Sequence, residues 1–225
     1  MKIYDISMEI REDMPIYKNK EEKKPKIILT RTLEQGANES KLEIESHTGT
    51  HADAFFHMLA KGRTIDKIEL GKFIGECVVL DFSNKKDKIA MQDFNDILSN
   101  KNKPMKNKKN NNKLKNIEIK KNDIILLKTR TKPMENFDFN FAYLEKSGAE
   151  FLANKKVKCV GIDNLGIERS QPNHDTHKKL FEKSIPIIEG LELSKIKQGR
   201  YYFIGLPLKI KDGDGSPIRA ALVRF

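Results

Sequence analysis

The histidines of this chain fall into two clusters, and both also contain carboxylates. Three of the five histidines lie in the segment His47-Thr-Gly-Thr-His-Ala-Asp-Ala-Phe-Phe-His57, which includes Asp53. The other two, His174 and His177, precede Glu189. Imidazole and carboxylate groups are ligands for divalent transition metals, and a catalytic site needs several of them to converge on one point. The two clusters therefore predict a metal site, and their spacing favours a hydrolytic one.

The backbone between the first two histidines is unsuited to a helix. The intervening Thr-Gly-Thr contains two β-branched residues and a glycine, all of which lower helix propensity. His47 and His51 are therefore not expected to form the helical i, i+4 pair of a zincin. A strand end or tight loop bent at Gly49 can instead bring His47, His51 and Asp53 around one ion. A lone histidine is usually a surface or core residue, but four ligand-type residues in one short segment favour a metal site.

Short runs of β-branched and aliphatic residues predict a chain richer in strands than in helices. The run 41–46 alternates, with Leu42 and Ile44 on one face, as in a strand with one wet side. The runs 77–80, 124–127 and 157–162 are apolar more continuously, as in strands covered on both faces. The predicted strands are 2–7, 26–32, 41–46, 77–82, 123–129, 157–163, 185–188, 201–208 and 218–225.

Three helices are predicted, at 92–99, 148–155 and 174–183, the second with a capping box formed by Ser147 and Glu150. The strand–helix–strand order from residue 123 to residue 188 predicts an α/β layer. No internal repeat is visible. The fold class predicted is therefore a single mixed α/β domain spanning residues 1–225, with a Lys/Asn-rich insertion at about 100–116.

The net charge of +11 is concentrated in that insertion. Residues 100–116 contain seven Lys and no acidic residue, so without them 36 basic residues face 32 acidic ones. A tract this poor in apolar residues buries too little surface to offset its ordering entropy and is expected to be a mobile loop. Nucleic-acid binding through this tract is an alternative function, but a basic face with interleaved aromatic residues, which would favour it, is missing from the sequence.

Cys77 and Cys159 each lie in an apolar run and are expected to be small buried side chains in neighbouring strands. No apolar run approaches the roughly 18–20 residues that span a bilayer. The N-terminal residues have no apolar core of a signal peptide. A cytoplasmic location and no membrane partner are expected.

The first histidine cluster resembles the signature of the cyclase family of metal-dependent hydrolases, whose best-described members are bacterial kynurenine formamidases. That signature runs His, any residue, Gly-Thr-His, any, Asp, any, Pro, any, His, and residues 47–57 follow it except at Phe55. A second match is Val160-Gly-Ile-Asp163 followed by His177, which stands twelve residues before Glu189 as the family's ligands do. A third, weaker match is Asp13-Met-Pro-Ile-Tyr17.

The resemblance, which covers about residues 3–225 outside the insertion, implies a role for each residue. His47, His51 and Asp53 would hold one metal, and Asp53, His177 and Glu189 a second. His57 would be the general acid/base. Tyr17 would contact the substrate. Apart from the resemblance, Phe55 is expected to line the substrate pocket because it lies close to His57 in the motif. The family fold is a compact α/β domain with a β-barrel-like core, usually assembled as dimers or tetramers.

Three departures from the family pattern bear on the substrate. Phe55 replaces the usual Pro, Gly166 and Glu168 replace a Ser and an Asp, and His174 stands one helical turn before His177 as a competing ligand. A relative that binds metal without catalysis is a further alternative. Three His and two carboxylates suit several divalent metals, so the ligand types do not select one. The resemblance to kynurenine formamidases implies one or two divalent ions, with zinc expected first and manganese as the alternative.

The reaction expected is hydrolysis of a small amide, with N-formylkynurenine as the leading substrate. A divalent ion activates water at neutral pH. His57, with an ordinary pKa of about 6.5, can take the proton of that water and return it to the leaving amine. Cyclic amides, imides or lactones, as for isatin hydrolases, are the alternative substrates within the family.

Overall fold

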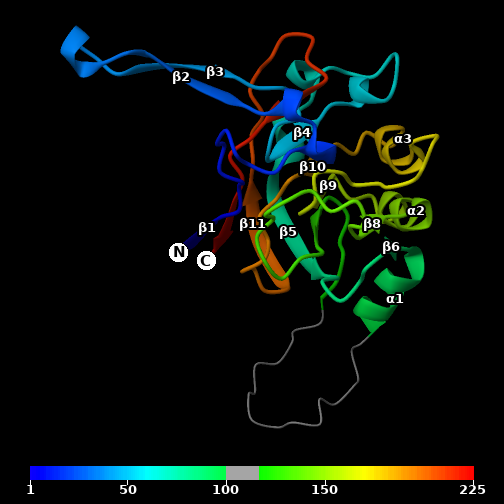
Figure 1. Ribbon diagram of the computed structural model, residues 1–225. Helices are drawn as coiled ribbons and strands as arrows, with labels where there is room; N and C mark the ends of the chain where they lie inside the picture. Colours follow the sequence, from blue (N-terminus) through cyan, green and yellow to red (C-terminus); the bar gives the residue numbers. More distant parts are fainter. Residues whose placement is uncertain (100–116) are drawn as a thin grey trace.

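One sheet of nine strands organises the part of the chain that the computed structural model describes, residues 1–99 and 117–225 (Figure 1). The Lys/Asn tract at 100–116, and with it the proposed nucleic-acid interface, lies outside the described residues. In order across the sheet, the strands are β1 (Lys2–Asp5), β13 (Ala221–Arg224), β11 (Gly199–Ile204), β5 (Ile74–Asp81), β7 (Ile124–Lys128), β9 (Cys159–Ile162), β10 (Ile187–Glu189), β4 (His51–Asp53) and β12 (Gly215–Pro217).

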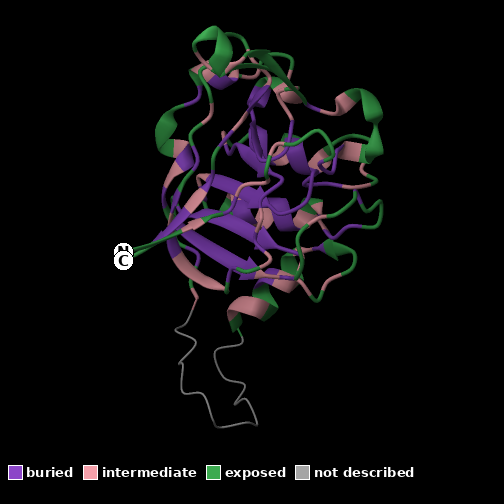
Figure 2. Ribbon diagram, turned by 60° about the vertical axis from the view of Figure 1, so that its left-hand side comes forward, coloured by how far each residue is buried: buried purple, intermediate pink, exposed green. Residues whose placement is uncertain are grey.

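The centre of the sheet is parallel and its two margins are antiparallel. β5, β7, β9 and β10 run parallel to one another, and their side chains are almost all buried, as the continuous apolar runs predict. Figure 2 shows these strands as the buried interior. The sheet remains open, because β1 and β12 lie at its opposite ends. The predicted mixed α/β fold class is confirmed, with an open sheet as its core.

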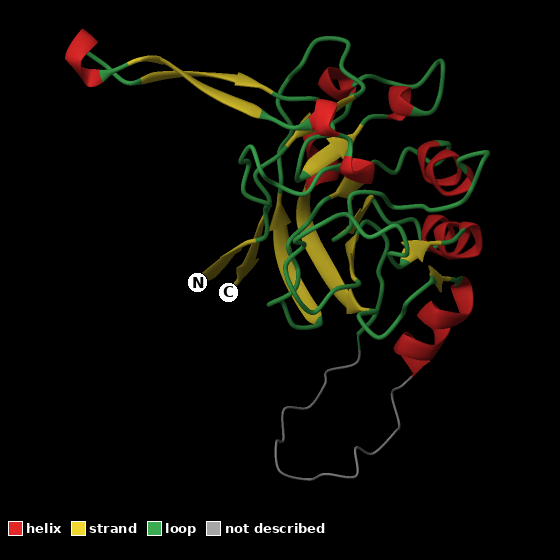
Figure 3. Ribbon diagram, viewed as in Figure 1, coloured by secondary structure: helices red, strands yellow, loops and turns green. Residues whose placement is uncertain are grey.

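Three helices cover one side of the sheet: α1 (Met91–Ser99), α2 (Lys146–Asn154) and α3 (Asp175–Phe181) (Figure 3). They stack in sequence order, with α2 in contact with both others. A small parallel pair, β6 (Lys88–Ile89) and β8 (Tyr143–Leu144), precedes α1 and α2. The predicted capping box is wrong: α2 begins at Lys146, and the Glu145 carboxylate accepts the Ser147 N–H at 2.9 Å.

A two-stranded ribbon, β2 (Lys26–Arg31) and β3 (Glu39–Glu43), projects from the body of the molecule (Figure 1). The prediction of one buried face is wrong here, because Leu42 is 55% exposed and all of β2 is exposed. The ribbon projects away from the body of the molecule, so no described part of the chain covers either of its faces. The alternation of apolar and polar residues therefore predicts the strand correctly, but it does not predict whether another layer covers the apolar face.

Both cysteines are buried, as predicted, but they are not on adjacent strands. Cys77 on β5 and Cys159 on β9 each pair with Ile124 of β7, which lies between them. Burial raises the pKa of the Cys159 thiol to about 12. Both are therefore inert core side chains. Among the described residues, no helix is both long enough and apolar enough to cross a membrane.

Candidate metal centre

The ligands predicted on β4 and β10 share one face of the sheet. The two strands pair antiparallel, with Glu189 opposite His51 and Ile187 opposite Asp53. Residues directly opposite each other, and residues two apart on one strand, point to the same face. His51, Asp53 and Glu189 therefore project together, and all three are buried. Nε2 of His51 lies 3.3 Å from Asp53 Oδ1 and 3.6 Å from Glu189 Oε2.

His47 reaches this face from the turn that precedes β4. Its Nδ1 lies 2.8 Å from Asp53 Oδ1, and its Nε2 lies 2.9 Å from Asp214 Oδ2. Gly215 stands opposite Asp53 on β12. A Cβ at Gly215 would lie 2.8 Å from His47 Cε1. Glycine at this position therefore leaves the space that the imidazole occupies beside Asp53.

A close backbone crossing fixes the turn itself. As predicted, the chain bends at Gly49, which has a φ of 60°, and Gly190 has a φ of 68°. A Cβ at Gly190 would collide with the Gly49 carbonyl oxygen, and the Thr50 hydroxyl donates to the Gly190 carbonyl at 2.5 Å. His51 Nδ1 lies 2.9 Å from the Gly49 carbonyl oxygen. That contact turns the other ring nitrogen, Nε2, toward the carboxylates.

His177 approaches the same face from helix α3. Its Nε2 lies 3.6 Å from Asp53 Oδ2 and 3.7 Å from Glu189 Oε1. Its Nδ1 lies 3.0 Å from Glu168 Oε1, a distance suited to an ion pair although the ring is not aligned for a hydrogen bond. His174, whose side chain is 49% exposed, contacts the same Oε1 of Glu168 at 2.5 Å. Of the two histidines on this segment, His177 is the one that faces Asp53 and Glu189.

His57 lies at the rim of the cluster. It ends a 3-10 turn, Phe55–His57, that follows β4 directly. Its ring centroid is 4.1 Å from that of His47, and its Nδ1 is 3.7 Å from Asp214 Oδ2. The side chain is 26% exposed. His57 therefore stands between the buried groups and solvent, where a proton can leave or enter.

The two aromatic residues predicted to contact the substrate lie in different surroundings. Tyr17 packs edge-on against Phe137 at 5.1 Å and lines a small hollow together with His47. Phe55 is 3% exposed, and its ring packs against Phe181 in the core. The structure therefore does not bring Phe55 to the hollow. By packing against Phe181, the Phe55 ring anchors the 3-10 turn that ends at His57.

Charge is the dominant property of the cluster. Burial raises the pKa of Asp53, but its interactions with His177, His47 and His51 outweigh burial and hold that pKa well below the usual range. Burial lowers the pKa of His47, but the hydrogen bonds and charges of Asp53 and then Asp214 raise it to about 9. Without a cation, His47 therefore carries a proton at neutral pH and donates from both ring nitrogens.

The remaining groups show the same balance. Burial opposes the charge of His177, yet Asp53 and Glu168 raise its pKa to about 10. Burial, followed by the charge of Asp53, raises the pKa of Glu189. Burial lowers the pKa of His57, so a neutral imidazole is favoured there. Protonated His47 and His177 thus balance the negative charge of the buried carboxylates. A bound cation can supply the same positive charge.

The donor set fits a divalent metal ion. Three imidazoles and two carboxylates converge on one buried region, and this mixture of nitrogen and oxygen ligands suits first-row divalent ions. Oδ2 of Asp53 is buried and has no hydrogen-bond partner among the described residues, which normally costs free energy unless a further group binds there. We call these five residues the central cluster: His47, His51, Asp53, His177 and Glu189.

Two carboxylates of this region lie outside the predicted set. Asp214 contacts His47, and Glu168 contacts His177. Asp214 belongs to the run Asp-Gly-Asp-Gly-Ser that leads into β12, a density of acid and glycine that signals a tight polar turn but not its neighbours. Glu168 stands in the sequence as a departure from the family pattern. Its carboxylate accepts the N–H groups of Thr176 and His177 at the start of α3, a tertiary contact that the predicted helix at 174–183 does not reveal.

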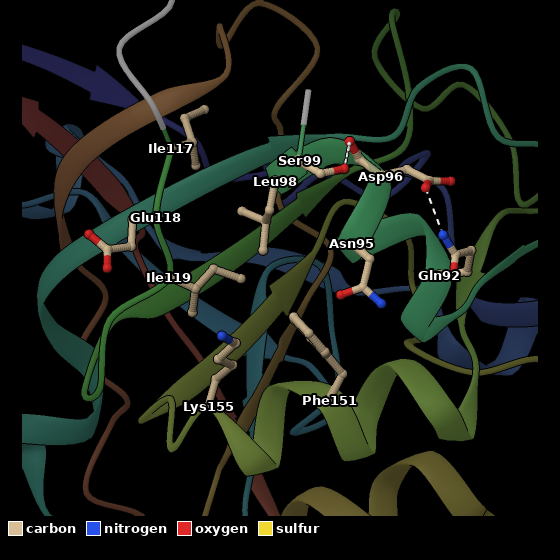
Figure 4. Close-up of a pocket in the computed structure, with 10 residues that line it drawn as sticks. All are labelled: Gln92, Asn95, Asp96, Leu98, Ser99, Ile117, Glu118, Ile119, Phe151 and Lys155. Carbon is tan, nitrogen blue, oxygen red and sulfur yellow. Dashed lines mark hydrogen bonds between the residues drawn. The ribbon is translucent and has the colours of Figure 1, made fainter. Parts of the chain in front are cut away.

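A larger cavity lies elsewhere among the described residues and has a different character. A cavity of about 590 Å³ opens between α1, α2 and residues 117–119 (Figure 4). Its walls carry the amide of Asn95, the carboxylate of Asp96 and the ring of Phe151, with histidine absent from its described lining. The metal-ligand side chains do not line this cavity, and among them only His47 lines the smaller hollow beside Tyr17.

Comparisons with known proteins agree with this geometry. The sequence profile of the Cyclase family matches residues 4–169. The chain is 27% identical to a kynurenine formamidase of Erythrobacter litoralis over 98% of this chain and 93% of that protein. It is 36% identical to a predicted metal-dependent hydrolase of Bacillus stearothermophilus, with a TM-score of 0.80 over 98% of this chain and 97% of that one. Isatin hydrolase A of Labrenzia aggregata, 20% identical, shares the fold with a TM-score of 0.81, covering 99% of this chain and 93% of that one.

Proposed function

The chain belongs to the Cyclase family, and we propose that this metal-dependent amide hydrolase cleaves N-formylkynurenine to kynurenine and formate. The observation that carries the proposal is the central cluster, in which five side chains of metal-ligand type meet near the partnerless Oδ2 of Asp53, four of them buried and His47 partly buried. The similarity to kynurenine formamidases over nearly the whole chain supports the substrate. The Labrenzia protein supports the fold alone, so cyclic amides such as isatin are the second substrate to test.

Each member of the central cluster has a proposed partner ion. His47, His51 and Asp53 would hold one ion, and Asp53, His177 and Glu189 a second. The position of Asp53 supports this bridging role, because its two oxygens face different histidines: Oδ1 faces His47 and His51, and Oδ2 faces His177. Zinc is proposed first and manganese second, since the ligand types suit both.

The bound metal would polarise the scissile carbonyl and lower the pKa of water to near neutrality. The chain's own residues would move the proton. His57 at the rim, with its pKa lowered by burial, accepts a proton from the attacking water. As the C–N bond breaks, His57 returns that proton to the leaving nitrogen. The formyl carbon gains the oxygen of water, which gives formate and a free aryl amine.

Substrate contact is assigned to Tyr17. Its ring lines the hollow beside His47, and Phe137 holds it edge-on. An aryl substrate can stack against such a ring while its carbonyl faces the cluster. Phe55 is proposed to support the His57 turn instead of contacting the substrate, because its ring is buried against Phe181.

The experiment that tests this function measures metal content and substrate range on the same preparation. Purified protein loaded with Zn²⁺, and separately with Mn²⁺, is assayed for release of kynurenine from N-formylkynurenine, with isatin in parallel. We expect bound metal and cleavage of the formamide. Cleavage of isatin alone would keep the hydrolase class and replace the substrate, and a metal-loaded protein inactive on both compounds and on other small amides would contradict the function.

We also propose that residues 1–225 form one domain and that the chain assembles as a homodimer or homotetramer. The ribbon supports self-association, because it exposes Ile27, Leu29, Leu33 and Leu42 away from the body of the chain. Exposed apolar groups gathered on one projection mark an interaction surface. Light scattering during gel filtration measures the mass directly, and a monomer at micromolar concentration would contradict the assembly.

A further inference from the structure

Asp214 touches two histidines with the same oxygen. Its Oδ2 lies 2.9 Å from Nε2 of His47 and 3.7 Å from Nδ1 of His57. The two imidazole rings lie side by side, with centroids 4.1 Å apart and a tilt of 41°. One carboxylate thus contacts the outer nitrogen of a proposed metal ligand and a nitrogen of the proposed acid/base.

The surroundings hold this carboxylate in place. Ser46 donates its hydroxyl to Oδ1 at 2.8 Å, and the backbone carbonyl of Asp214 accepts the Ala54 N–H at 2.9 Å. Ala54 directly follows β4, so the Asp214 loop is fastened to the strand that carries His51 and Asp53. Oδ1 is used by Ser46, which leaves Oδ2 for the two rings.

We infer that Asp214 is a positioning residue that orients both His47 and His57, an inference that rests on the proposed function and deepens it. Accepting from Nε2 of His47 commits the opposite nitrogen, Nδ1, to the side of Asp53, where the ion would bind. The same oxygen beside Nδ1 of His57 turns its Nε2 toward the substrate. Carboxylates that orient metal-ligating histidines in this way typically contribute about 10–100-fold to metal affinity or activity.

The assignment predicts a graded series of variants. Asp214→Ala removes the acceptor, whereas Asp214→Asn keeps one oxygen that can accept from His47 but loses the charge. Ser46→Ala leaves both histidine contacts and removes only the group that fixes the carboxylate. Asp212→Asn is the matched control, because it removes the same charge from the same loop at an exposed residue.

The test measures Zn²⁺ affinity by calorimetry on chelator-treated full-length protein, together with kcat and KM on the proposed formamide. We expect Asp214→Ala to weaken Zn²⁺ binding by about 10–100-fold and to lower kcat by a similar factor with KM nearly unchanged. Asp214→Asn should fall between Asp214→Ala and wild type, Ser46→Ala should show a smaller loss in the same direction, and Asp212→Asn should match wild type.

The positioning role of Asp214 and the proposed function would be contradicted by different results. Wild-type affinity and kcat in both Asp214 variants would overturn the positioning role while the proposed function stands. Failure of the wild-type protein itself to bind Zn²⁺ or Mn²⁺ would overturn the proposed function. If Asp214→Ala does not fold, Asp214→Asn and Ser46→Ala decide the question, and equal Zn²⁺ affinity in these two variants and wild type refutes the role.

Discussion

The ribbon and the central cluster are both rich in charge, yet charge does different work in each. In the ribbon, Arg31 pairs with Glu39 at 3.0 Å and Lys41 with Glu43 at 2.7 Å, with all four side chains more than two-fifths exposed. Such pairs are screened by water and contribute little to stability. In the central cluster the groups are buried, and their pKa values are displaced in both directions.

Comparing the ribbon with the central cluster shows that buried charges indicate a functional site, whereas exposed ion pairs do not. A buried charge keeps its ionised form only when a partner compensates it. In the central cluster that compensation comes from protons on His47 and His177, which a divalent cation can replace. The charged side chains of the ribbon need no compensating partner, because they are exposed to water. The following predictions test this contrast, from the largest effect to the smallest.

Replacing a member of the central cluster should have the largest effect. His51→Ala should abolish hydrolysis and lower metal content and the melting temperature together. An ion that binds only the folded state stabilises it by about 2.7 kcal/mol at a concentration of 100 times Kd. Elemental analysis and thermal unfolding with and without Zn²⁺ measure both effects. Full metal content in His51→Ala would remove this residue from the ligand set.

His57 should separate proton transfer from metal binding. Because it lies at the rim and not between Asp53 and Glu189, His57→Ala should keep the metal and reduce kcat by about 10²–10⁴-fold. Steady-state kinetics and metal analysis on one sample give the two values. A fully active variant would exclude the acid/base role, and a metal-free one would move His57 into the ligand set.

Another buried carboxylate, Asp163, provides a case with no imidazole partner among the described residues. Burial raises its pKa to about 6, although Thr129 and the Arg130 N–H donate to it. The folded state therefore holds this proton more tightly than the unfolded chain, and the stabilisation is lost as pH rises from about 4 through 6.

Asp163→Asn should remove the decrease in the free energy of unfolding that deprotonation of Asp163 causes as pH rises. Two pKa units correspond to about 2.7 kcal/mol. The unfolding free energy of the variant, relative to wild type, should therefore rise by an amount of this order between pH 4 and pH 7. Denaturant unfolding of chelator-treated protein at both pH values measures it. A difference between variant and wild type that does not change with pH would show that folding does not raise the pKa of Asp163.

The ribbon should show the smallest effect. Glu39→Gln breaks the exposed pair with Arg31, and the free energy of unfolding should change by less than about 1 kcal/mol. Urea unfolding provides the measurement, and hydrolysis should be unaffected. A loss of several kcal/mol would mean that this pair stabilises the fold far more than an exposed ion pair does, and the contrast between the two regions would fail.

The sequence predicted the long elements of the fold well. The continuous apolar runs gave β5, β7 and β9, because a strand covered on both faces requires apolar side chains throughout. The structure fixes β4 as a strand, where the sequence left open a strand end or a loop. Three residues of a strand carry too little periodicity to recognise, and pairing with β10 and β12 is what makes them one. Leu42 shows the converse, since its alternating pattern does not reveal that the ribbon has no covering layer.

The central cluster was foreseeable because its members lie in two short segments, whereas its supports were not. Asp214 stands 167 positions from His47, and no local pattern links them. Gly215 belongs to the site only through the register of β12 against β4. Phe55 was predicted to line the pocket from its place beside His57, but the turn directs its ring into the core. Long-range strand pairing decided the positions of Asp214 and Gly215, and a local 3-10 turn decided that of Phe55.

Anomalous diffraction from crystals of the wild-type protein grown with Zn²⁺ or Mn²⁺ tests the central claim most directly. We predict a peak at the metal's absorption edge among His47, His51, Asp53, His177 and Glu189, adjacent to Asp53 Oδ2. The same experiment on Asp53→Ala should give no peak there. A wild-type map without a peak in the central cluster, from protein held at saturating metal, would contradict the account.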